Sequence, residues 1–297
     1  MEVTKTVVVT GASGFIGSHL ARALVDLGYD VRAMTRHPER YDGGGAPVRG
    51  DVFDPDSVAG ALDGADAAYY LVHSLDSDDF EAKDAAAART FAAAAADADL
   101  ERVVYLGGLG DDGTELSAHL RSRRTVERIL REGPVPVTAL RAAVVVGAGG
   151  ISWEITRQLV ERLPALLTPR WVKTRTQPIA LPDVIRYLIG VLEPAEARGR
   201  VFEIGGPEVL RYIDMLQRAA SVRGETLPNV TVPLLTPRLS SAWLAFVTDV
   251  DLTTARNLVD SLSTEVVVHD RGIEAVVPGP TIGYEEAVRL ALQDRAA

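Results

Sequence analysis

The chain has 297 residues, of which 47% are hydrophobic and 24% are charged. These proportions match soluble globular proteins, so they exclude a disordered or fibrous protein. Lys and Arg total 31 against 41 Asp and Glu, and the net charge of −10 argues against a broad surface for nucleic acid or anionic lipid. The length suits two structural units, or one α/β domain with an appendage.

The chain contains no cysteine, which excludes disulfides, thiol nucleophiles and cysteine-ligated zinc. The first residues pass directly into a strand-like run without the features of a signal peptide. The alanine-rich stretch 85–98 is interrupted by Arg89 and Thr90, so it is not a membrane span. We therefore expect a cytoplasmic protein. The five histidines show no metal-ligand spacing, so no metal is expected.

Short β-branched runs alternate with helical patterns through the first half of the chain, which is typical of a parallel sheet wound with helices. Apolar residues at helical spacing follow the first run and stop at Gly28, where that helix should end. The sequence predicts strands at 6–10, 31–34, 47–49, 67–72, 102–106 and 135–140, with helices in the intervals.

After Gly147 this regular alternation changes. The patterns then predict helices at 152–163, 183–192, 212–222, 239–247 and 284–293, and strands at 178–180, at 201–204 and near Val230. We assign residues 1–150 to a first domain, to which the chain returns at about 176–205. Residues 151–175 and 206–297 are expected to form a smaller substrate-binding lobe.

A glycine-rich turn lies between the first strand and the first helix, with the spacing GxxGxxG over residues 11–17. Gly11 permits the tight turn, Gly14 lets the backbone approach a pyrophosphate, and Gly17 lets the helix lie close to the sheet. In a strand-turn-helix context this motif indicates dinucleotide binding. The expected fold class is α/β, a Rossmann-type doubly wound parallel sheet with a smaller C-terminal lobe.

The end of the second strand indicates which dinucleotide is bound. NAD-binding domains place an acidic residue there, whereas this chain has Thr35 and Arg36. A guanidinium can contact the 2′-phosphate of NADP, so NADP (NADPH) is the expected cofactor. Arg40 is a weaker candidate for the same pocket. The alternative for Arg36 is a surface ion pair with Glu39.

Four strings resemble the extended and atypical short-chain dehydrogenase/reductases: TGASGFIG at 10–17, GDV at 50–52, YYLVHS at 69–74 and LRAAVVVGAG at 140–149. Five further strings are most similar to the atypical NAD(P)H-binding subgroup, also described as NmrA-like or epimerase/dehydratase-like. They are YLGGLG, HLRSR, TPRWVKTRTQPIALPDV, FEIGGPEVL and LTPRLSSAW. The resemblance implies that the pyrophosphate is lined by Gly11, Ser13, Gly14, Phe15, Ile16 and Gly17. It implies further that Asp51 and Val52 meet the adenine, and that Leu71, Val72 and His73 border the nicotinamide ribose. Asp51 is also a common helix-capping residue, so a purely structural role is the alternative.

The chain departs from these relatives at the catalytic positions. Active short-chain dehydrogenases carry a serine after the fifth strand and a YxxxK pair on the next helix, whereas this chain has Gly107-Gly108 and a His119/Arg123 pair. An imidazole can exchange a proton near neutral pH, so His119 is the candidate proton donor. Arg123 is expected to orient ribose or an anionic substrate group. The alternative is that both residues form a polar helix face without catalysis.

Two further groups bear on the substrate. The cations Arg157, Arg162, Arg170, Lys173 and Arg175 could receive an anionic group or could form a solvated surface. The apolar residues Trp243, Leu244, Phe246 and Val247 could line a substrate pocket or belong to a core or a subunit interface. We therefore expect a small apolar or anionic substrate, and a homodimer stays open.

These observations predict an NAD(P)-dependent oxidoreductase of the atypical short-chain type. Hydride would move to or from a small organic carbonyl, alcohol or activated alkene. Two alternatives stay open: an NADP(H)-sensing regulatory protein without catalysis, and a nucleotide-sugar epimerase or dehydratase. The absence of the serine and the Tyr-Lys pair favours the sensor and weakens the epimerase alternative.

Overall fold

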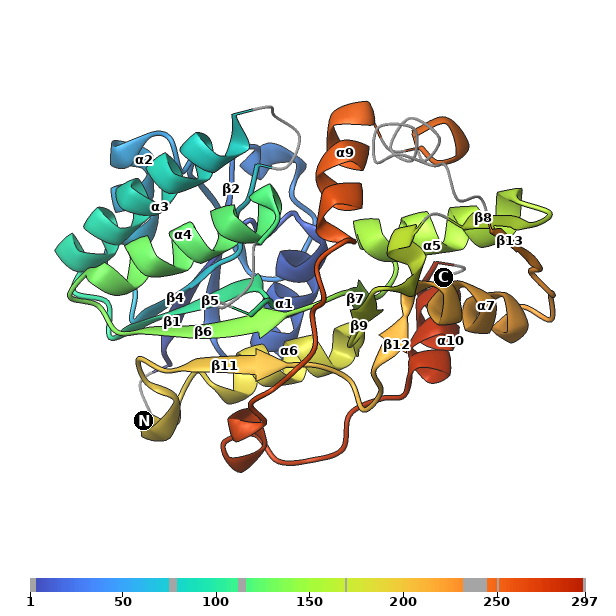
Figure 1. The fold of residues 1–297 in the computed structure, drawn as a ribbon. Coiled ribbons are helices and arrows are strands. Elements are labelled where there is room, and N and C mark those ends of the chain that lie inside the picture. The colour runs from blue at the N-terminus through green and yellow to red at the C-terminus, as the bar shows by residue number, and fades with distance from the viewer. Residues whose placement is uncertain are drawn as a thin grey trace.

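A computed structural model describes residues 4–74, 79–111, 116–168, 170–231, 245–249 and 251–295. Its centre is a seven-stranded sheet with the strand order β11-β6-β5-β4-β1-β2-β3, in which all neighbours are parallel (Figure 1). The strands are β1 (Thr6–Thr10), β2 (Asp30–Thr35), β3 (Ala46–Arg49), β4 (Ala67–Tyr70), β5 (Arg102–Gly108), β6 (Val137–Ala142) and β11 (Val201–Ile204). The predicted Rossmann-type fold class is confirmed.

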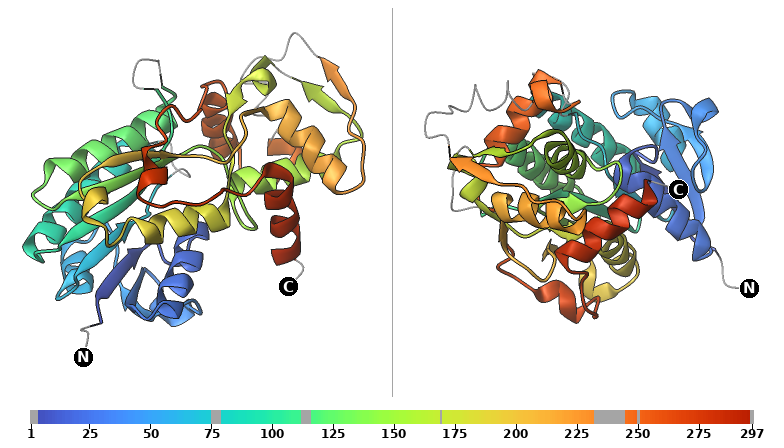
Figure 2. Two further views of the ribbon diagram at one scale, coloured as in Figure 1. Left: turned by 90° about the horizontal axis from the view of Figure 1, so that it is seen from below. Right: turned by 90° about the vertical axis from the view of Figure 1, so that its right-hand side faces the viewer.

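Helices cover both faces of this sheet (Figure 2). One face carries α1 (Phe15–Asp26) and α6 (Leu181–Gly190), and the other carries α2 (Pro55–Leu62), α3 (Phe80–Asp97) and α4 (Ala118–Glu132). The alternation of side chains along a strand explains the two cores. Val7 and Val9 of β1 pack against α1, whereas Val8 packs on the opposite face.

The remaining helices lie mainly beside the carboxyl ends of the strands, on the right in Figure 1. A third core joins α5 (Ile151–Arg162), α7 (Tyr212–Val222) and α10 (Tyr284–Asp294) around Trp153, Met215 and Val288. α9 (Leu252–Ser261) packs against α4, and the hydroxyl groups of Ser117 and Ser261 are hydrogen-bonded at 3.1 Å. This contact joins α9 to α4, one of the helices that cover the central sheet.

Short strands and 3₁₀ helices connect these layers. Three two-stranded sheets pair β7 (Val145–Val146) with β10 (Ile179–Ala180), β9 (Arg175–Thr176) with β12 (Leu210–Arg211), and β8 (Leu166–Thr168) with β13 (Asn229–Thr231). The 3₁₀ helices are η1 (Pro38–Arg40), η2 (Arg170–Lys173), η3 (Ala195–Ala197) and η4 (Gly272–Ala275).

Prolines account for two differences from the predicted bounds. β6 begins at Val137 rather than 135, because Pro136 has no N–H to donate to a strand ladder. α6 begins at Leu181 rather than 183, and Pro182 stands in its first turn, where proline is tolerated. The division into domains stays a prediction. Ile273 and Val277, assigned from sequence to the smaller lobe, pack in the α1/α6 core.

No helix within the described ranges is both long enough and apolar enough to span a bilayer.

Candidate functional site

The glycine turn is built for a close approach of backbone to backbone. Gly11 has φ of +65°, in the left-handed region, and its carbonyl accepts a hydrogen bond from the Gly14 N–H at 2.9 Å. A Cβ on Gly17 would lie 2.2 Å from the Gly11 oxygen, so only glycine lets α1 pack on the turn. Gly14 is the exposed N-cap of α1 and offers no side chain to the first N–H groups. The start of α1 therefore suits an anionic group.

A cavity of about 250 Å³ opens beside this turn, at the carboxyl ends of the strands. The chain passes from β1 to β2 on one side and reaches β4 on the other, so the strand order reverses between β1 and β4. Ligands of open α/β sheets bind at such a switch point. The predicted site residues that line the cavity are Gly11, Gly14, Phe15, Ile16, Gly17, Leu71, His73, His119 and Arg123.

Five predicted cofactor residues do not line this cavity: Ser13, Arg36, Asp51, Val52 and Val72. Ser13 is exposed on the turn. The Val52 side chain is buried in the core on the α2–α4 face, and the partly buried Val72 side chain packs against that core. One carboxylate oxygen of Asp51 accepts a hydrogen bond from the Phe53 N–H at 3.0 Å, which is a structural role in the turn before α2.

Arg36 is exposed just after β2, and within the described chain its guanidinium has no ion pair or hydrogen bond. The alternative pair with Glu39 does not form, because Glu39 contacts His37 at 3.3 Å and Arg40 at 3.8 Å. Arg40 is 79% exposed in that pair. Arg36 is thus available for a ligand at the carboxyl end of β2, the strand that pairs with β1.

Arg123 is the charged group of the cavity wall and is only 9% exposed. Its Nη2 donates to the Leu106 carbonyl, and its guanidinium lies 5.4 Å from the centre of the Tyr105 ring. Its Nη1 is buried and has no hydrogen-bond partner among the described residues. A buried donor without an acceptor is costly, so this atom suits an oxygen of a bound molecule. Together with the glycine turn, it fits an NAD(P)H molecule lying along the cavity.

His119 lies one helical turn before Arg123 and lines the same cavity. Burial lowers the pKa of His119 to about 3, and the positive charge of Arg123 and the neighbouring His73 add to the effect. The imidazole is therefore neutral at physiological pH. It can donate an N–H hydrogen bond, but it is a poor source of a proton for the donor role predicted from the sequence.

Some cavity residues were not singled out as site residues from the sequence. They are Leu106, Gly107, Gly108, Ala142, Ala143, Val145, Gly150, Ile151 and Ser152. Most of them stand at or just after the ends of β5 and β6, or at the start of α5, where the carboxyl-end rule for parallel sheets could have found them. Gly108 also brings α4 close, because a Cβ there would lie 2.8 Å from Leu120.

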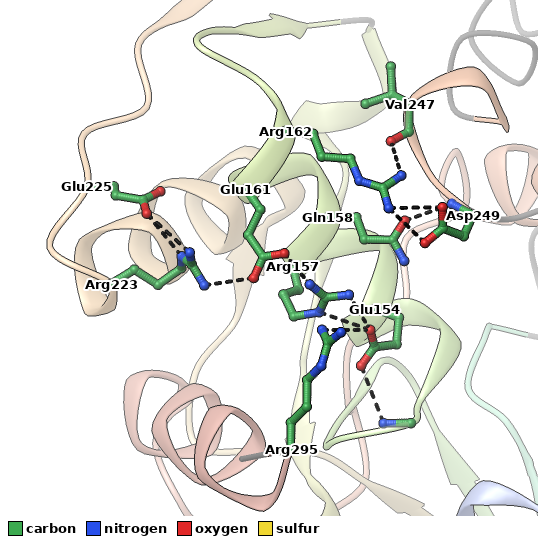
Figure 3. Close-up of polar contacts among 11 residues, drawn as sticks. Glu154, Arg157, Gln158, Glu161, Arg162, Arg223, Glu225, Val247, Asp249 and Arg295 are labelled. Carbon is green, nitrogen blue, oxygen red and sulfur yellow. Dashed lines mark hydrogen bonds and ion pairs between the residues drawn. The ribbon is translucent and has the colours of Figure 1, made fainter.

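The four cations of the predicted group whose side chains are described do not line the cavity. Arg157 pairs with Glu154 and Glu161, and Arg162 binds the Asp249 carboxylate at 2.7 Å (Figure 3). Arg175 pairs with Glu265, also at 2.7 Å. Lys173 is exposed, and the side chain of Arg170 lies outside the described residues. Ion pairs thus occupy three of these cations, two of which, Arg157 and Arg162, belong to α5.

The two described members of the predicted apolar group, Phe246 and Val247, do not line the cavity. Trp243 and Leu244 lie outside the described residues. Phe246 is 89% exposed, and Val247 packs against the third core.

A sequence model of the NAD(P)H-binding family matches residues 11–162. The chain belongs to this family. Among curated proteins, it is 29% identical over 169 residues to a ceramide reductase of Caulobacter vibrioides, covering 54% of this chain and 52% of that one. It is 32% identical over 119 residues to a cinnamoyl-CoA reductase of Petunia hybrida, covering 36% of each. A 2-alkyl-3-oxoalkanoate reductase of Stenotrophomonas maltophilia is 41% identical over 66 residues, or 22% of this chain and 20% of that one.

The chain thus matches between a fifth and about half of the length of these curated relatives. Solved structures match almost throughout. The triphenylmethane reductase of Citrobacter sp. complexed with NADP(H) has a TM-score of 0.79 at 17% identity and covers 96% of this chain and 99% of that one. A nucleoside-diphosphate-sugar epimerase of Staphylococcus aureus has a TM-score of 0.76 at 15% identity, covering 96% and 99%. These likenesses show the fold, and with the family match they confirm the predicted resemblance to short-chain dehydrogenase/reductases.

Proposed function

We propose that this protein is an NADP(H)-dependent oxidoreductase that transfers hydride to a small organic acceptor. The observation that carries the proposal is that the glycine turn, His119 and Arg123 line the same cavity. The names of three curated relatives support the direction of the reaction, because all three are reductases. Family membership supports the cofactor class.

NADP is proposed over NAD because of Arg36. This residue directly follows the second strand, where an acid would accept hydrogen bonds from the ribose of NAD. Its guanidinium is exposed and unpaired within the described chain, so no existing ion pair has to break for it to meet a 2′-phosphate. NADP(H) in the complex of the Citrobacter reductase supports the same choice.

His119 and Arg123 favour an acceptor whose reduction needs no strong acid as proton donor. A bound nicotinamide supplies the hydride. His119, neutral at pH 7, donates an N–H hydrogen bond, and Arg123 Nη1 donates to a ribose hydroxyl or to an oxygen of the acceptor. A positive charge near a developing oxyanion stabilises it, and water can then supply the proton. Among carbonyls and activated alkenes, we therefore favour conjugated enones and quinones.

The test is NADPH consumption with a panel of aldehydes, ketones, enones and quinones, in parallel with NADH. We expect turnover with NADPH that is highest for enones or quinones. Gly14→Val serves as the control, since it should bind no cofactor. Tight NADPH binding without turnover of any panel member would contradict the proposal and favour the sensor alternative.

A further inference from the structure

A second cavity, of about 50 Å³, lies between α5 and α7. Its lining is mainly apolar and consists of Val144, Ser152, Ile155, Thr156, Leu159, Tyr212, Met215, Leu216 and Leu262. None of these lining residues carries a charge, whereas the larger cavity holds Arg123. The small cavity is therefore suited to an apolar group and unsuited to a phosphate or a carboxylate.

Two of the three polar side chains that line this small cavity already have partners. The Thr156 hydroxyl donates to the Ser152 carbonyl at 2.9 Å, and Tyr212 also has an interaction partner in the protein. The Ser152 hydroxyl differs, because it has no hydrogen-bond partner in the described part of the chain. One free hydroxyl thus belongs to an otherwise satisfied pocket.

The two cavities meet at Ser152, which lines both of them. Their walls are also adjacent in sequence, since Val145 lines the larger cavity and Val144 the smaller one. A molecule held beside His119 and Arg123 can therefore direct a substituent past Ser152 into the apolar pocket. At roughly 10–15 Å³ for each water-sized position, the pocket takes a group of about three to five non-hydrogen atoms.

We infer that the small cavity binds a short alkyl substituent of the acceptor, and that the Ser152 hydroxyl hydrogen-bonds to an oxygen beside that substituent. This inference rests on the proposed function, because it places the acceptor in the larger cavity. The substrate class is an oxygen-bearing unsaturated compound with an apolar side chain of about three or four carbons. A nucleoside-diphosphate group cannot enter this pocket without leaving its charge unpaired.

The experiment measures binding without chemistry. A series of 2-alkylphenols, from phenol to 2-pentylphenol, is titrated calorimetrically into the NADP⁺-saturated protein. These probes carry the oxygen beside the alkyl group, and NADPH does not reduce them. Affinity should rise about four-fold for each methylene up to propyl or butyl, the value expected for burying a methylene, and then stop rising.

Substitutions in the lining of the small cavity should change the dependence of affinity on alkyl chain length in opposite directions. Ile155→Trp fills the pocket and should abolish the chain-length dependence, while Met215→Ala enlarges it and should shift the longest tolerated chain by one or two carbons. Ser152→Ala should weaken the binding of every phenol about five-fold without changing the dependence of affinity on chain length. The matched control is Ile189→Trp, since Ile189 is a half-buried isoleucine of α6 that lines neither cavity.

An affinity that does not change with chain length in the parent protein would overturn the inference. So would an equal response of the Ile155 and Ile189 variants. Thermal denaturation and NADP⁺ titration confirm that each variant is folded, and Met215→Ala keeps the test open if the larger side chain is not tolerated. A failure of NADPH turnover with chain-length-dependent phenol binding intact would contradict only the proposed function.

Discussion

The two ends of the site are built differently. At the glycine turn, backbone groups of one short segment form the proposed cofactor-binding surface, and the charge of Arg36 is exposed and unpaired within the described chain. At the other end, side chains from several elements converge, and Arg123 and His119 lie largely away from solvent. The proposed cofactor-binding turn is therefore local in the sequence, whereas the environment of His119 and Arg123 depends on the whole fold.

The largest expected effect, on the free energy of unfolding, concerns Gly17, where α1 packs against the glycine turn. Gly17→Val places a branched side chain against the Gly11 carbonyl, where even a Cβ would lie at 2.2 Å. We expect a loss of roughly 3 kcal/mol in the free energy of unfolding, because backbone on both sides prevents relaxation. Urea denaturation measures it. A variant as stable as the parent would show that α1 does not depend on this close packing.

Gly14→Val separates cofactor binding from folding. Gly14 is exposed, and a Cβ there would meet only the Gly11 oxygen, at 3.2 Å, so the fold should survive. A valine would nevertheless occupy the space of a pyrophosphate, and NADPH affinity should fall by about 100-fold or more. The thermal shift on adding NADPH reports the loss. A shift equal to that of the parent would place the pyrophosphate elsewhere.

Arg36→Ala probes the exposed end alone. The preference for NADPH over NADH should shrink by roughly 1 to 3 kcal/mol, the contribution of charged hydrogen bonds to a 2′-phosphate. NADH affinity should barely change, and calorimetry with both cofactors measures the difference. Arg40→Ala is the control, since Arg40 is paired with Glu39. An equal loss of the preference for NADPH in the Arg36 and Arg40 variants would contradict a specific role of Arg36.

The smallest effect concerns the buried end. The folded-state pKa of His119, about 3, lies below the unfolded value of about 6.5, so the unfolded chain binds the extra proton between these values. The stability from this group is therefore complete above pH 6.5 and is lost as the pH falls toward 3. His119→Phe should reduce the stability loss between pH 7.5 and 5.5 by roughly 1 kcal/mol, allowing for partial exposure. Identical pH profiles of unfolding for the parent and His119→Phe would contradict a neutral imidazole with a lowered pKa.

The sequence was most informative where short-range rules decide the structure. Strand β1 and the turn at Gly11 and Gly14 follow from β-branched residues and glycine spacing, and the structure has both. The position of His119 and Arg123 on one helix face also follows from their four-residue spacing. What could not be predicted was the environment of these side chains.

Burial and long-range contacts set that environment. The pKa of His119 depends on its burial and on the charge of Arg123, and the unpaired Nη1 of Arg123 is known only once β5 is packed beside α4. Ser152 carries no sequence motif at all. Its interest comes from lying between two cavities that α5 and α7 form together.

The contrast between the two ends can be tested directly with two ligands of different reach. Adenosine 2′,5′-bisphosphate carries the adenosine half with its phosphates, and NADP⁺ adds the nicotinamide half. Imidazole NMR signals, with His119 assigned through the His119→Phe variant, should change for His119 only with NADP⁺. Arg36→Ala should weaken both ligands by the same factor. A His119 signal that moves with the bisphosphate alone, or stays unchanged at saturating NADP⁺, would contradict the placement of the nicotinamide beside His119 and Arg123.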